Sequence, residues 1–236
     1  MNSSSDIGAR LNEVRTDISR ACADAGRSAD DVTLIVVTKF HPSSLVRELY
    51  ELGVRDVGEN RHQEAAEKSS ELADLDLTWH FIGQLQSNKA RAVLEYADVI
   101  HSIDRASLVS ALDRAWHDRR ETGRARPPVP AFVQVNLTDD PNRGGVGLEG
   151  LEKFAEDVAA LDSIDLQGVM AVAPLDTDPN QAFERVARAS EVVRSVVPRA
   201  RFISAGMSHD FVEAIAHGAT HLRIGSAITG NRPTAG

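Results

Sequence analysis

The chain has 236 residues, of which 42% are hydrophobic and 26% are charged. These values are ordinary for a globular protein with a full apolar core, and the length suits one large α/β domain, since an eight-stranded barrel needs ~250 residues. The formal net charge of −9 argues against non-specific binding to nucleic acid or to an anionic membrane, although a local pocket can still hold a small anion.

One helix and then eight strand-length segments are predicted in chain order. Residues 6–26 form a helix that reads as Ile7–Ala25, ends at Gly26 and lies outside the repeat that follows. Apolar segments of strand length then recur at Val32–Thr38, Val54–Gly58, Leu77–Ile82, Val99–Ile103, Val129–Asn136, Leu166–Val172, Arg201–Ala205 and His221–Ile224. Amphipathic segments lie between several of them, at Ser43–Leu52, Leu108–Arg120, Leu148–Leu161 and Gln181–Val197.

Eight strands that alternate with helices predict an α/β fold with a parallel sheet, and eight is the number that closes a (β/α)₈ TIM-type barrel. An open, doubly wound sheet is the main alternative, because periodicity does not reveal whether a sheet closes. We expect a single barrel domain over residues 1–236, with residues 231–236 as a flexible tail.

The cellular compartment follows from features near the N-terminus. The start, from Met1 to Asp6, has no basic region followed by an apolar stretch, so no signal peptide is predicted. The apolar run Leu34–Val37 is far too short to cross a bilayer. Cys22 is the only cysteine and cannot form an intramolecular disulfide, which fits a reducing compartment. We predict a cytoplasmic protein with no membrane partner.

The last two strands are followed by loops that suit a phosphate. Barrels often bind phosphate with the loops after strands 7 and 8, near the start of a helix. These loops carry Gly206-Met207-Ser208 and Gly225-Ser226. Glycine lets a backbone N–H approach an anion closely, and a serine at the start of a helix adds a hydroxyl donor. A purely structural role, with the serines as N-caps and the glycines as turns, remains open.

Two cationic side chains lie where chemistry is expected in a barrel. Lys39 directly follows the first apolar strand, at the rim, where a lysine with a lowered pKa can form a Schiff base; a solvated strand-end lysine is the alternative. Arg223, in the last strand, can only donate hydrogen bonds and would keep a facing pyridine nitrogen unprotonated; an ion pair is the alternative. The eight histidines show no metal-binding spacing, so no metal centre is predicted; His80 and His101 are expected to pack or hydrogen-bond at strand ends.

Several ordered segments give the chain a specific resemblance. They are Val36-Val-Thr-Lys39-Phe-His-Pro42, Gly58-Glu-Asn-Arg-His-Gln-Glu64, Trp79-His-Phe-Ile-Gly-Gln-Leu-Gln-Ser-Asn-Lys89, Gln134-Val-Asn136, Gly168-Val-Met170 with Pro174, and Gly206-Met-Ser-His-Asp210 with Arg223-Ile-Gly-Ser-Ala-Ile228. Together they resemble the pyridoxal phosphate homeostasis protein family, whose members are alanine racemase-like and bind pyridoxal 5′-phosphate (PLP). The resemblance covers most of the chain, from about Val32 to Gly230.

The resemblance implies a barrel like the N-terminal domain of alanine racemase, with PLP as the cofactor and Lys39 as its Schiff-base lysine. It implies that Arg223 faces the pyridine nitrogen and that Asn60 lies near the cofactor. The phosphate would be held by the loops after strands 7 and 8, through Ser208, Gly225 and Ser226 with the neighbouring backbone of Gly206 and Met207. The sequence departs from the family pattern at Phe40, where a small polar residue is usual, and at Thr229, where Phe is common.

The resemblance also implies a carrier of PLP and not an enzyme. In the racemases that the chain resembles, a tyrosine from a separate C-terminal domain is the second acid/base, and this chain stops soon after the eighth strand. Its two tyrosines, Tyr50 and Tyr96, fall in predicted helices. We therefore expect a monomer that holds PLP and supplies PLP-requiring apoenzymes. A racemase with another second base, such as His80 or a water, and a Schiff-base aldolase acting on a sugar phosphate remain as alternatives.

Overall fold

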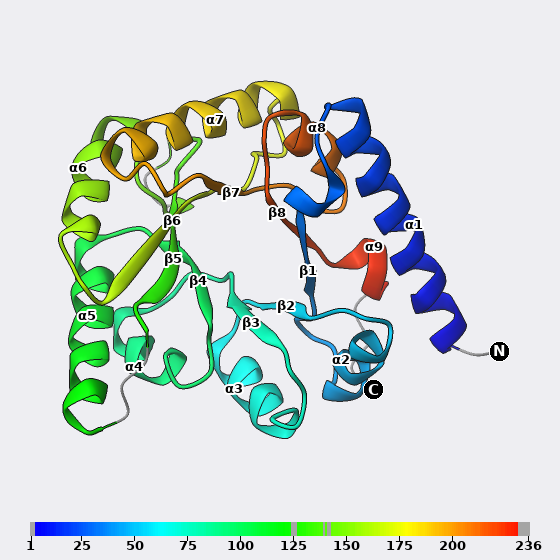
Figure 1. Cartoon of the computed structure of the whole chain (residues 1–236), viewed down its shortest axis with the longest axis horizontal. Helices are drawn as coiled ribbons and strands as arrows, with labels where there is room; N and C mark the ends of the chain where they lie inside the picture. The colour runs from blue at the N-terminus through cyan, green and yellow to red at the C-terminus, as the bar shows by residue number, and fades with distance from the viewer. Residues whose placement is uncertain (1–2, 124–126, 139, 141–142, 231–236) are drawn as a thin grey trace.

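Eight parallel strands form a closed barrel in sequential order, as predicted (Figure 1). The computed structural model describes residues 3–123, 127–138, 140 and 143–230. The strands are β1 (Thr33–Val37), β2 (Asp56–Glu59), β3 (Thr78–Phe81), β4 (Val99–Ile103), β5 (Val129–Gln134), β6 (Ile164–Met170), β7 (Phe202–Ser204) and β8 (His221–Ile224). The ring closes where β1 pairs with β8, from Thr33 opposite His221 to Val36 opposite Ile224. This pairing excludes the open sheet.

Helices surround the barrel and connect its strands. They are α1 (Ser3–Asp24), α2 (Ser43–Glu51), α3 (His62–Glu71), α4 (Ala90–Val93), α5 (Ala106–Glu121), α6 (Leu148–Ala159), α7 (Pro179–Val196), α8 (Phe211–Ala216) and α9 (Ser226–Thr229), with short 3₁₀ helices at Ala29–Asp31 and Ser87–Lys89. The predicted helices differ from these bounds by a few residues at their ends. The predicted flexible tail, residues 231–236, lies outside the described residues.

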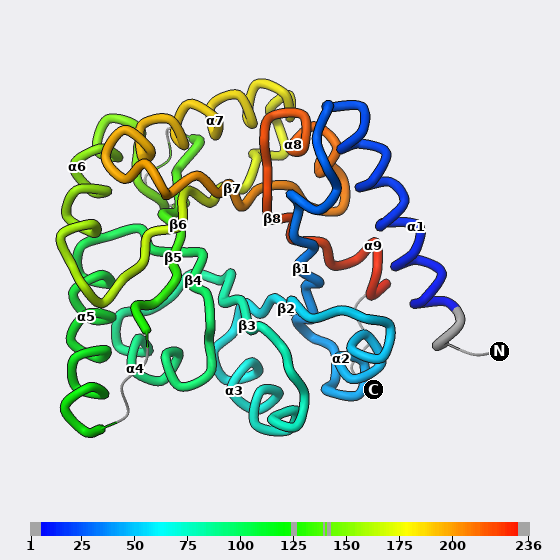
Figure 2. The backbone as a smooth tube through the Cα atoms, viewed as in Figure 1, coloured from blue at the N-terminus to red at the C-terminus, as the bar shows by residue number. Residues whose placement is uncertain are grey.

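The helix that precedes the repeat packs on the outside of the barrel, next to its point of closure. Figure 2 shows α1 running beside α8 and α9. The guanidinium of Arg10 donates to the carbonyl of Ile228 at 2.7 Å, and that of Arg27 donates to the carbonyls of Ile215 and Ala219 at 2.8 Å. The first helix therefore joins the two ends of the described chain.

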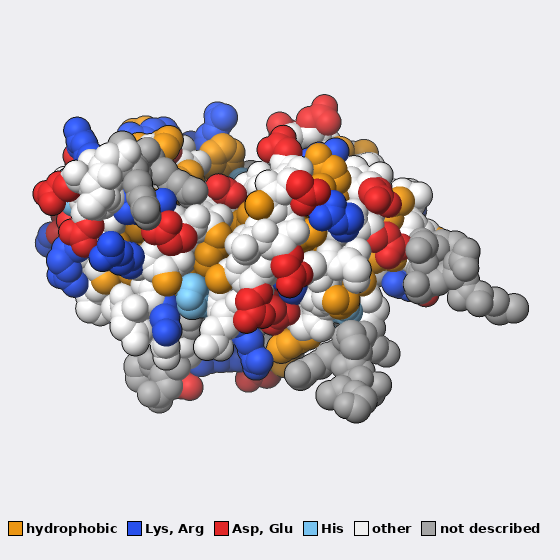
Figure 3. All heavy atoms as spheres, turned by 90° about the horizontal axis from the view of Figure 1, so that it is seen from below, with side chains coloured by type: hydrophobic (Ala, Val, Ile, Leu, Met, Phe, Trp, Pro, Cys, Tyr) orange, Lys and Arg blue, Asp and Glu red, His pale blue; other side chains and the backbone are white. Residues whose placement is uncertain are grey.

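The main apolar core lies between the strands and the helices. Val36, Val57, Ile100, Val133 and Leu222 are fully buried there, because both faces of a parallel barrel strand are covered. None of the described helices is long and apolar enough to cross a bilayer. On the face drawn in Figure 3, acidic and basic side chains are interspersed.

The inside of the barrel is unusually polar for this fold. Branched apolar side chains normally fill a barrel interior. Here the buried polar side chains of His80, His101, Ser204 and Arg223 share the interior with Phe132, whose ring stacks on that of His101 with centroids 4.5 Å apart. Burying such polar groups is costly unless they are hydrogen-bonded, and all four are hydrogen-bonded inside the barrel.

Candidate cofactor site

Lys39 lies in the turn between β1 and α2, at the rim of the barrel. Its side chain is exposed, whereas Thr38 before it is fully buried. Phe40 after it has a φ of 69°, in the left-handed region that a side chain other than glycine seldom adopts. Lys39 Nζ lies 5.9 Å from the centroid of the Phe40 ring, and the guanidinium of Arg61 lies over the same ring at 4.9 Å. Lys39 is thus flanked by two constrained residues.

A buried ion-pair network holds both neighbours of Lys39. The ammonium of Lys68, on α3, contacts three acceptors: Glu59 Oε1 at 2.7 Å, Glu64 Oε1 at 2.7 Å and the Thr38 carbonyl at 2.8 Å. Thr38 Oγ1 donates to Glu59 Oε1 at 2.7 Å, and the Phe40 N–H donates to Glu64 Oε1 at 2.5 Å. Hydrogen bonds to Lys68, Glu59 and Glu64 therefore fix the residues on each side of Lys39.

Burial raises the pKa of Glu59, and the hydrogen bonds from Lys68 and Thr38 oppose that rise. The sequence interpretation did not single out Lys68 or Glu59. The spacing of Glu64 and Lys68, four residues apart on a helix, was the available signal. It does not reveal that this ion pair is buried.

Asn60 follows β2 at the same end of the barrel. It is half-buried, and its Oδ1 atom is buried without a hydrogen-bond partner among the described residues. The loop after β3 crosses close to it, because a Cβ on Gly83 would lie 2.1 Å from the Asn60 carbonyl oxygen. Asn60 also lines a cavity of about 940 Å³ on the side of β2, β3 and β4, together with Arg61, His62, Gln63, Phe81, Gln84, Leu85, Gln86, Lys89, Asp104, Arg105, Gly144 and Gly145.

The loops after β7 and β8 bring two serine hydroxyls together. Ser208 Oγ and Ser226 Oγ lie 3.4 Å apart, and Ser208 Oγ also accepts a long hydrogen bond of 3.4 Å from the Ala227 N–H. The expected helices follow, but Asp210 is the N-cap of α8 and Gly225 is the N-cap of α9. Neither serine therefore occupies the N-cap of the helix that directly follows it, although Ser208 accepts from the Ala227 N–H in the first turn of α9. A structural role for Ser208 at the start of α9 and a role in anion binding are compatible.

The backbone requires glycine at position 206, and Gly225 lies close to the end of β1. Gly206 has a φ of 92°, and a Cβ there would lie 2.8 Å from the Cβ of Ala214. A Cβ on Gly225 would lie 3.4 Å from the Cβ and from the carbonyl oxygen of Val37, so this loop passes close to the end of β1. Met207 donates its backbone N–H to Asp210 Oδ1 at 2.6 Å. The phosphate-type loops thus lie next to the strand that leads to Lys39.

Arg223 lies inside the barrel beneath these loops, and only 5% of its surface is exposed. One terminal nitrogen donates to Ser204 Oγ at 2.6 Å and the other to the carbonyl of Ala171 at 2.8 Å. Burial lowers the pKa of Arg223 to about 10, and the charge of Asp210 opposes that shift. The guanidinium consequently stays protonated at neutral pH and still acts only as a donor.

The two histidines predicted at strand ends lie deeper than the rim. His80 and His101 are hydrogen-bonded, as expected, but they are 3% and 0% exposed and lie inside the barrel. Tyr50 is on α2, as predicted, and stacks with Arg55. Tyr96 lies in a turn after α4 and not in a helix, because α4 ends at Val93. Burial raises the pKa of Tyr96 above its ordinary value.

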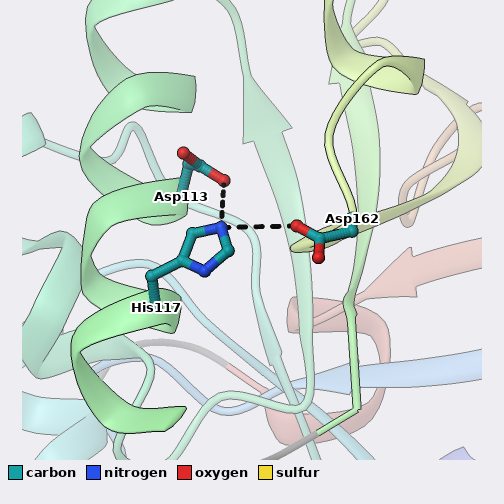
Figure 4. A group of neighbouring side chains, drawn as sticks. All are labelled: Asp113, His117 and Asp162. Atoms are coloured by element: carbon teal, nitrogen blue, oxygen red, sulfur yellow. Dashed lines mark ion pairs between the residues drawn. The ribbon is translucent and has the colours of Figure 1, made fainter. Parts of the chain in front are cut away.

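One group of side chains on the outer surface has the composition of a metal site. His117 Nε2, on α5, lies 3.4 Å from Asp113 Oδ1 and 3.3 Å from Asp162 Oδ1 (Figure 4). Asp113 also accepts a hydrogen bond from Ser163 Oγ at 2.6 Å, and Asp162 lies 3.6 Å from Arg120. These contacts describe a partly exposed ion-pair cluster, and the group is not part of the candidate cofactor site.

Comparison with known proteins identifies the class of barrel to which this chain belongs. The family described as "Alanine racemase, N-terminal domain" matches residues 13–233, so this is a barrel of the alanine racemase N-terminal class. Within that class, the chain belongs to the pyridoxal phosphate homeostasis protein family. The member from Mycobacterium leprae is 37% identical over 238 residues, which cover 96% of this chain and 93% of that protein.

Solved structures agree with this placement. PipY of Synechococcus elongatus, determined with PLP bound, is 35% identical and superposes with a TM-score of 0.81 over 95% of this chain and 100% of its own. Alanine racemase from Corynebacterium glutamicum, at 14% identity and a TM-score of 0.69, shares the fold; the match covers 96% of this chain and 62% of the racemase. The expected family and fold are confirmed.

Proposed function

We propose that this protein binds PLP in vitamin B6 homeostasis and holds the cofactor on Lys39 without appreciable turnover. The observation that carries the proposal is the juxtaposition of the β1 end with the loops after β7 and β8, where Gly225 approaches Val37 and two serine hydroxyls lie 3.4 Å apart. Similarity to PipY, whose structure contains PLP, and to relatives named pyridoxal phosphate homeostasis protein supports it.

The residues at the barrel mouth fit the chemical groups of PLP. Its phosphate needs several donors, and the hydroxyls of Ser208 and Ser226 and backbone N–H groups of the two glycine-containing loops can supply them. The residues assigned to the phosphate are Gly206, Met207, Ser208, Gly225 and Ser226. Asn60 offers a buried Oδ1 without a partner among the described residues, an acceptor for a polar ligand group. PLP supplies an aldehyde that condenses with an amine and releases water, and Lys39 is the amine assigned to it.

The surroundings of Arg223 favour retention over catalysis. A guanidinium that faces the pyridine nitrogen offers it a hydrogen bond without giving up a proton, which makes the ring a weaker electron sink. A racemase also needs a second acid or base. His80 is engaged on both ring nitrogens inside the barrel. Tyr50 stacks with Arg55, and Tyr96 lies in the turn after α4. These positions support retention of PLP over racemisation.

The decisive experiment is an absorption spectrum of the purified protein with PLP, followed by borohydride reduction and mass mapping. The proposal expects a yellow protein with the reduced adduct on Lys39, and no adduct in Lys39→Ala. Lys89→Ala is the matched control, because Lys89 lies at the barrel mouth in the cavity lining. An adduct on another lysine would refute the assignment, and a protein that takes up no PLP would favour the aldolase.

The absence of turnover needs a separate measurement. Incubation with each of the twenty amino acids in deuterated solvent should give no exchange at the α-carbon at the rates of ordinary enzymes. Exchange at those rates would favour the racemase.

The monomeric state, the single domain and the cytoplasmic location remain predictions, and sedimentation of the purified protein tests the first of them.

A further inference from the structure

A continuous hydrogen-bonded chain of side chains runs through the barrel interior and ends at Arg223. We call it the interior chain; its members are Asp56, His80, His101 and Ser204. His80 Nε2 lies 3.0 Å from Asp56 Oδ1, and His80 Nδ1 lies 2.9 Å from His101 Nε2. His101 Nδ1 lies 2.8 Å from Ser204 Oγ, which accepts from Arg223 at 2.6 Å.

The interior chain connects opposite ends of the barrel. Asp56 is the first residue of β2, at the end away from Lys39, and its side chain is 29% exposed. The other members are nearly or fully buried and come from β3, β4 and β7, while Arg223 comes from β8. Barrel closure alone brings these residues together, since His101 and Ser204 are 103 positions apart in sequence.

The hydrogen bonds of the interior chain have one direction that satisfies every group. Arg223 only donates, so the Ser204 hydroxyl accepts from it and gives its own proton to His101 Nδ1. Burial, with the nearby charge of Arg223, lowers the pKa of His101 well below its ordinary value, so His101 is neutral. Its Nδ1 accepts from the Ser204 hydroxyl, so its one proton is on Nε2. That proton points to His80 Nδ1, and His80 Nε2–H donates to Asp56. In the opposite direction the buried Ser204 hydroxyl would have no acceptor within the chain.

This directionality offsets the cost of a buried cation. Among the described residues, no carboxylate forms an ion pair with the buried Arg223 guanidinium, and the charge of Asp210 acts on it only from a longer distance. A buried charge without a direct ion-pair partner is costly. Aligned hydrogen bonds polarise one another in a low-dielectric interior. The interior chain therefore presents the negative end of a series of aligned dipoles to Arg223, and the series ends on the Asp56 carboxylate.

We propose that the interior chain is a positioning device that fixes the orientation of the Arg223 guanidinium and thereby sets how firmly, and in which electronic state, the PLP ring is held. This inference rests on the proposed function and deepens it. Ser204 fixes one terminal nitrogen of Arg223 and the Ala171 carbonyl fixes the other, so the plane of the guanidinium is defined by two bonds. Ser204 holds that plane only while His101 accepts its proton.

The first test needs no cofactor. Two-bond ¹H–¹⁵N correlation spectra of the protein without PLP, at neutral pH, should show His101 and His80 as neutral Nε2–H tautomers. A His101 ring protonated on Nδ1, alone or together with Nε2, would overturn the proposal. The assignment can be made with His101→Gln and His80→Gln variants, each of which removes one set of signals.

The second test compares serine variants in complex with PLP. Ser204→Ala should raise the PLP dissociation constant about tenfold, as expected for loss of one hydrogen bond to a charged group, and should shift the absorption band. Ser204→Thr keeps the hydroxyl and should restore both properties. Ser102→Ala is the matched control: Ser102 is also a fully buried strand serine, but its Oγ has no hydrogen-bond partner among the described residues.

A variant far from Arg223 keeps the inference testable if Ser204→Ala fails to fold. Asp56→Ala changes a partly exposed residue at the far end of the barrel, and it should shift the absorption band in the same direction as Ser204→Ala. If the unsubstituted protein binds PLP, and Ser204→Ala and Asp56→Ala bind it equally well with the same spectrum, the role of the interior chain is refuted while the proposed function stands. A parent protein that takes up no PLP would instead defeat the proposed function.

Discussion

Replacing Lys68 by methionine tests the network behind Lys39. The side chain of Lys68 is 6% exposed and that of Glu59 is 1% exposed, so solvent screens their 2.7 Å contact very little. Removing one partner of a buried ion pair typically costs about 3–5 kcal/mol, because the remaining charge loses its compensation. Methionine nearly preserves the length of the side chain, so the cavity contribution is small. We expect Lys68→Met to lower the free energy of unfolding by about this amount.

The assay is urea unfolding at neutral pH, with Lys153→Met as the control. Lys153 and Asp157 also form an i,i+4 pair on a helix, but both side chains are largely exposed, so their loss should leave stability unchanged. The same Lys68→Met protein should bind PLP more weakly, because the Thr38 carbonyl and Glu64 no longer share a cation. If Lys68→Met unfolds at the same urea concentration as Lys153→Met, the network does not hold the Lys39 turn.

Three further predictions concern the loops and the barrel interior. Ser208→Ala and Ser226→Ala should each weaken PLP retention in equilibrium dialysis without changing the thermal unfolding midpoint. Unchanged retention in both variants would mean that the phosphate is not bound by these two loops. Gly206→Ala should destabilise the protein by about 1–3 kcal/mol in urea, because it combines a positive φ with a clash at Ala214, whereas no change would mean that the loop relaxes freely. Burial lowers the pKa of His221 from 6.5 to about 4, so its contribution to stability is complete above pH 6.5 and is lost as the pH falls toward 4. In His221→Phe, the number of protons taken up on unfolding between pH 6.5 and 4 should fall by one. An unchanged slope of the free energy of unfolding against pH would refute this prediction.

The fold followed from the sequence because barrel strands are short apolar runs separated by helices. The eight predicted segments match the eight strands, although the sixth strand begins at Ile164, two residues before the predicted start. The apolar run that ends near Val172 outlasts the pairing of β6, and Val172 is half-exposed. Ala171 is buried whereas Val172 is half-exposed, so the end of an apolar run marks neither the end of strand pairing nor the end of burial.

The parts of the site that escaped prediction depend on contacts between distant strands. His101 and Ser204 are ordinary residues in their own segments, and a strand buried on both faces gives no sign of which side chains point inward. Lys68 lies outside the amphipathic segments that the sequence predicted, and nothing in its local sequence indicates burial. Its burial follows from how α3 docks behind the Lys39 turn, and local periodicity does not contain that information.

The pairing of β1 with β8 determines at which stage of folding the candidate site forms. Lys39 is among the first barrel residues to leave the ribosome, whereas Ser208 and Ser226 are among the last. The two halves of the site meet only when the final strand pairs with the first, a contact that spans almost the whole sequence and is slow to form. A chain without β8 has only one half of the proposed PLP site, so binding of PLP at this site would require the closed barrel.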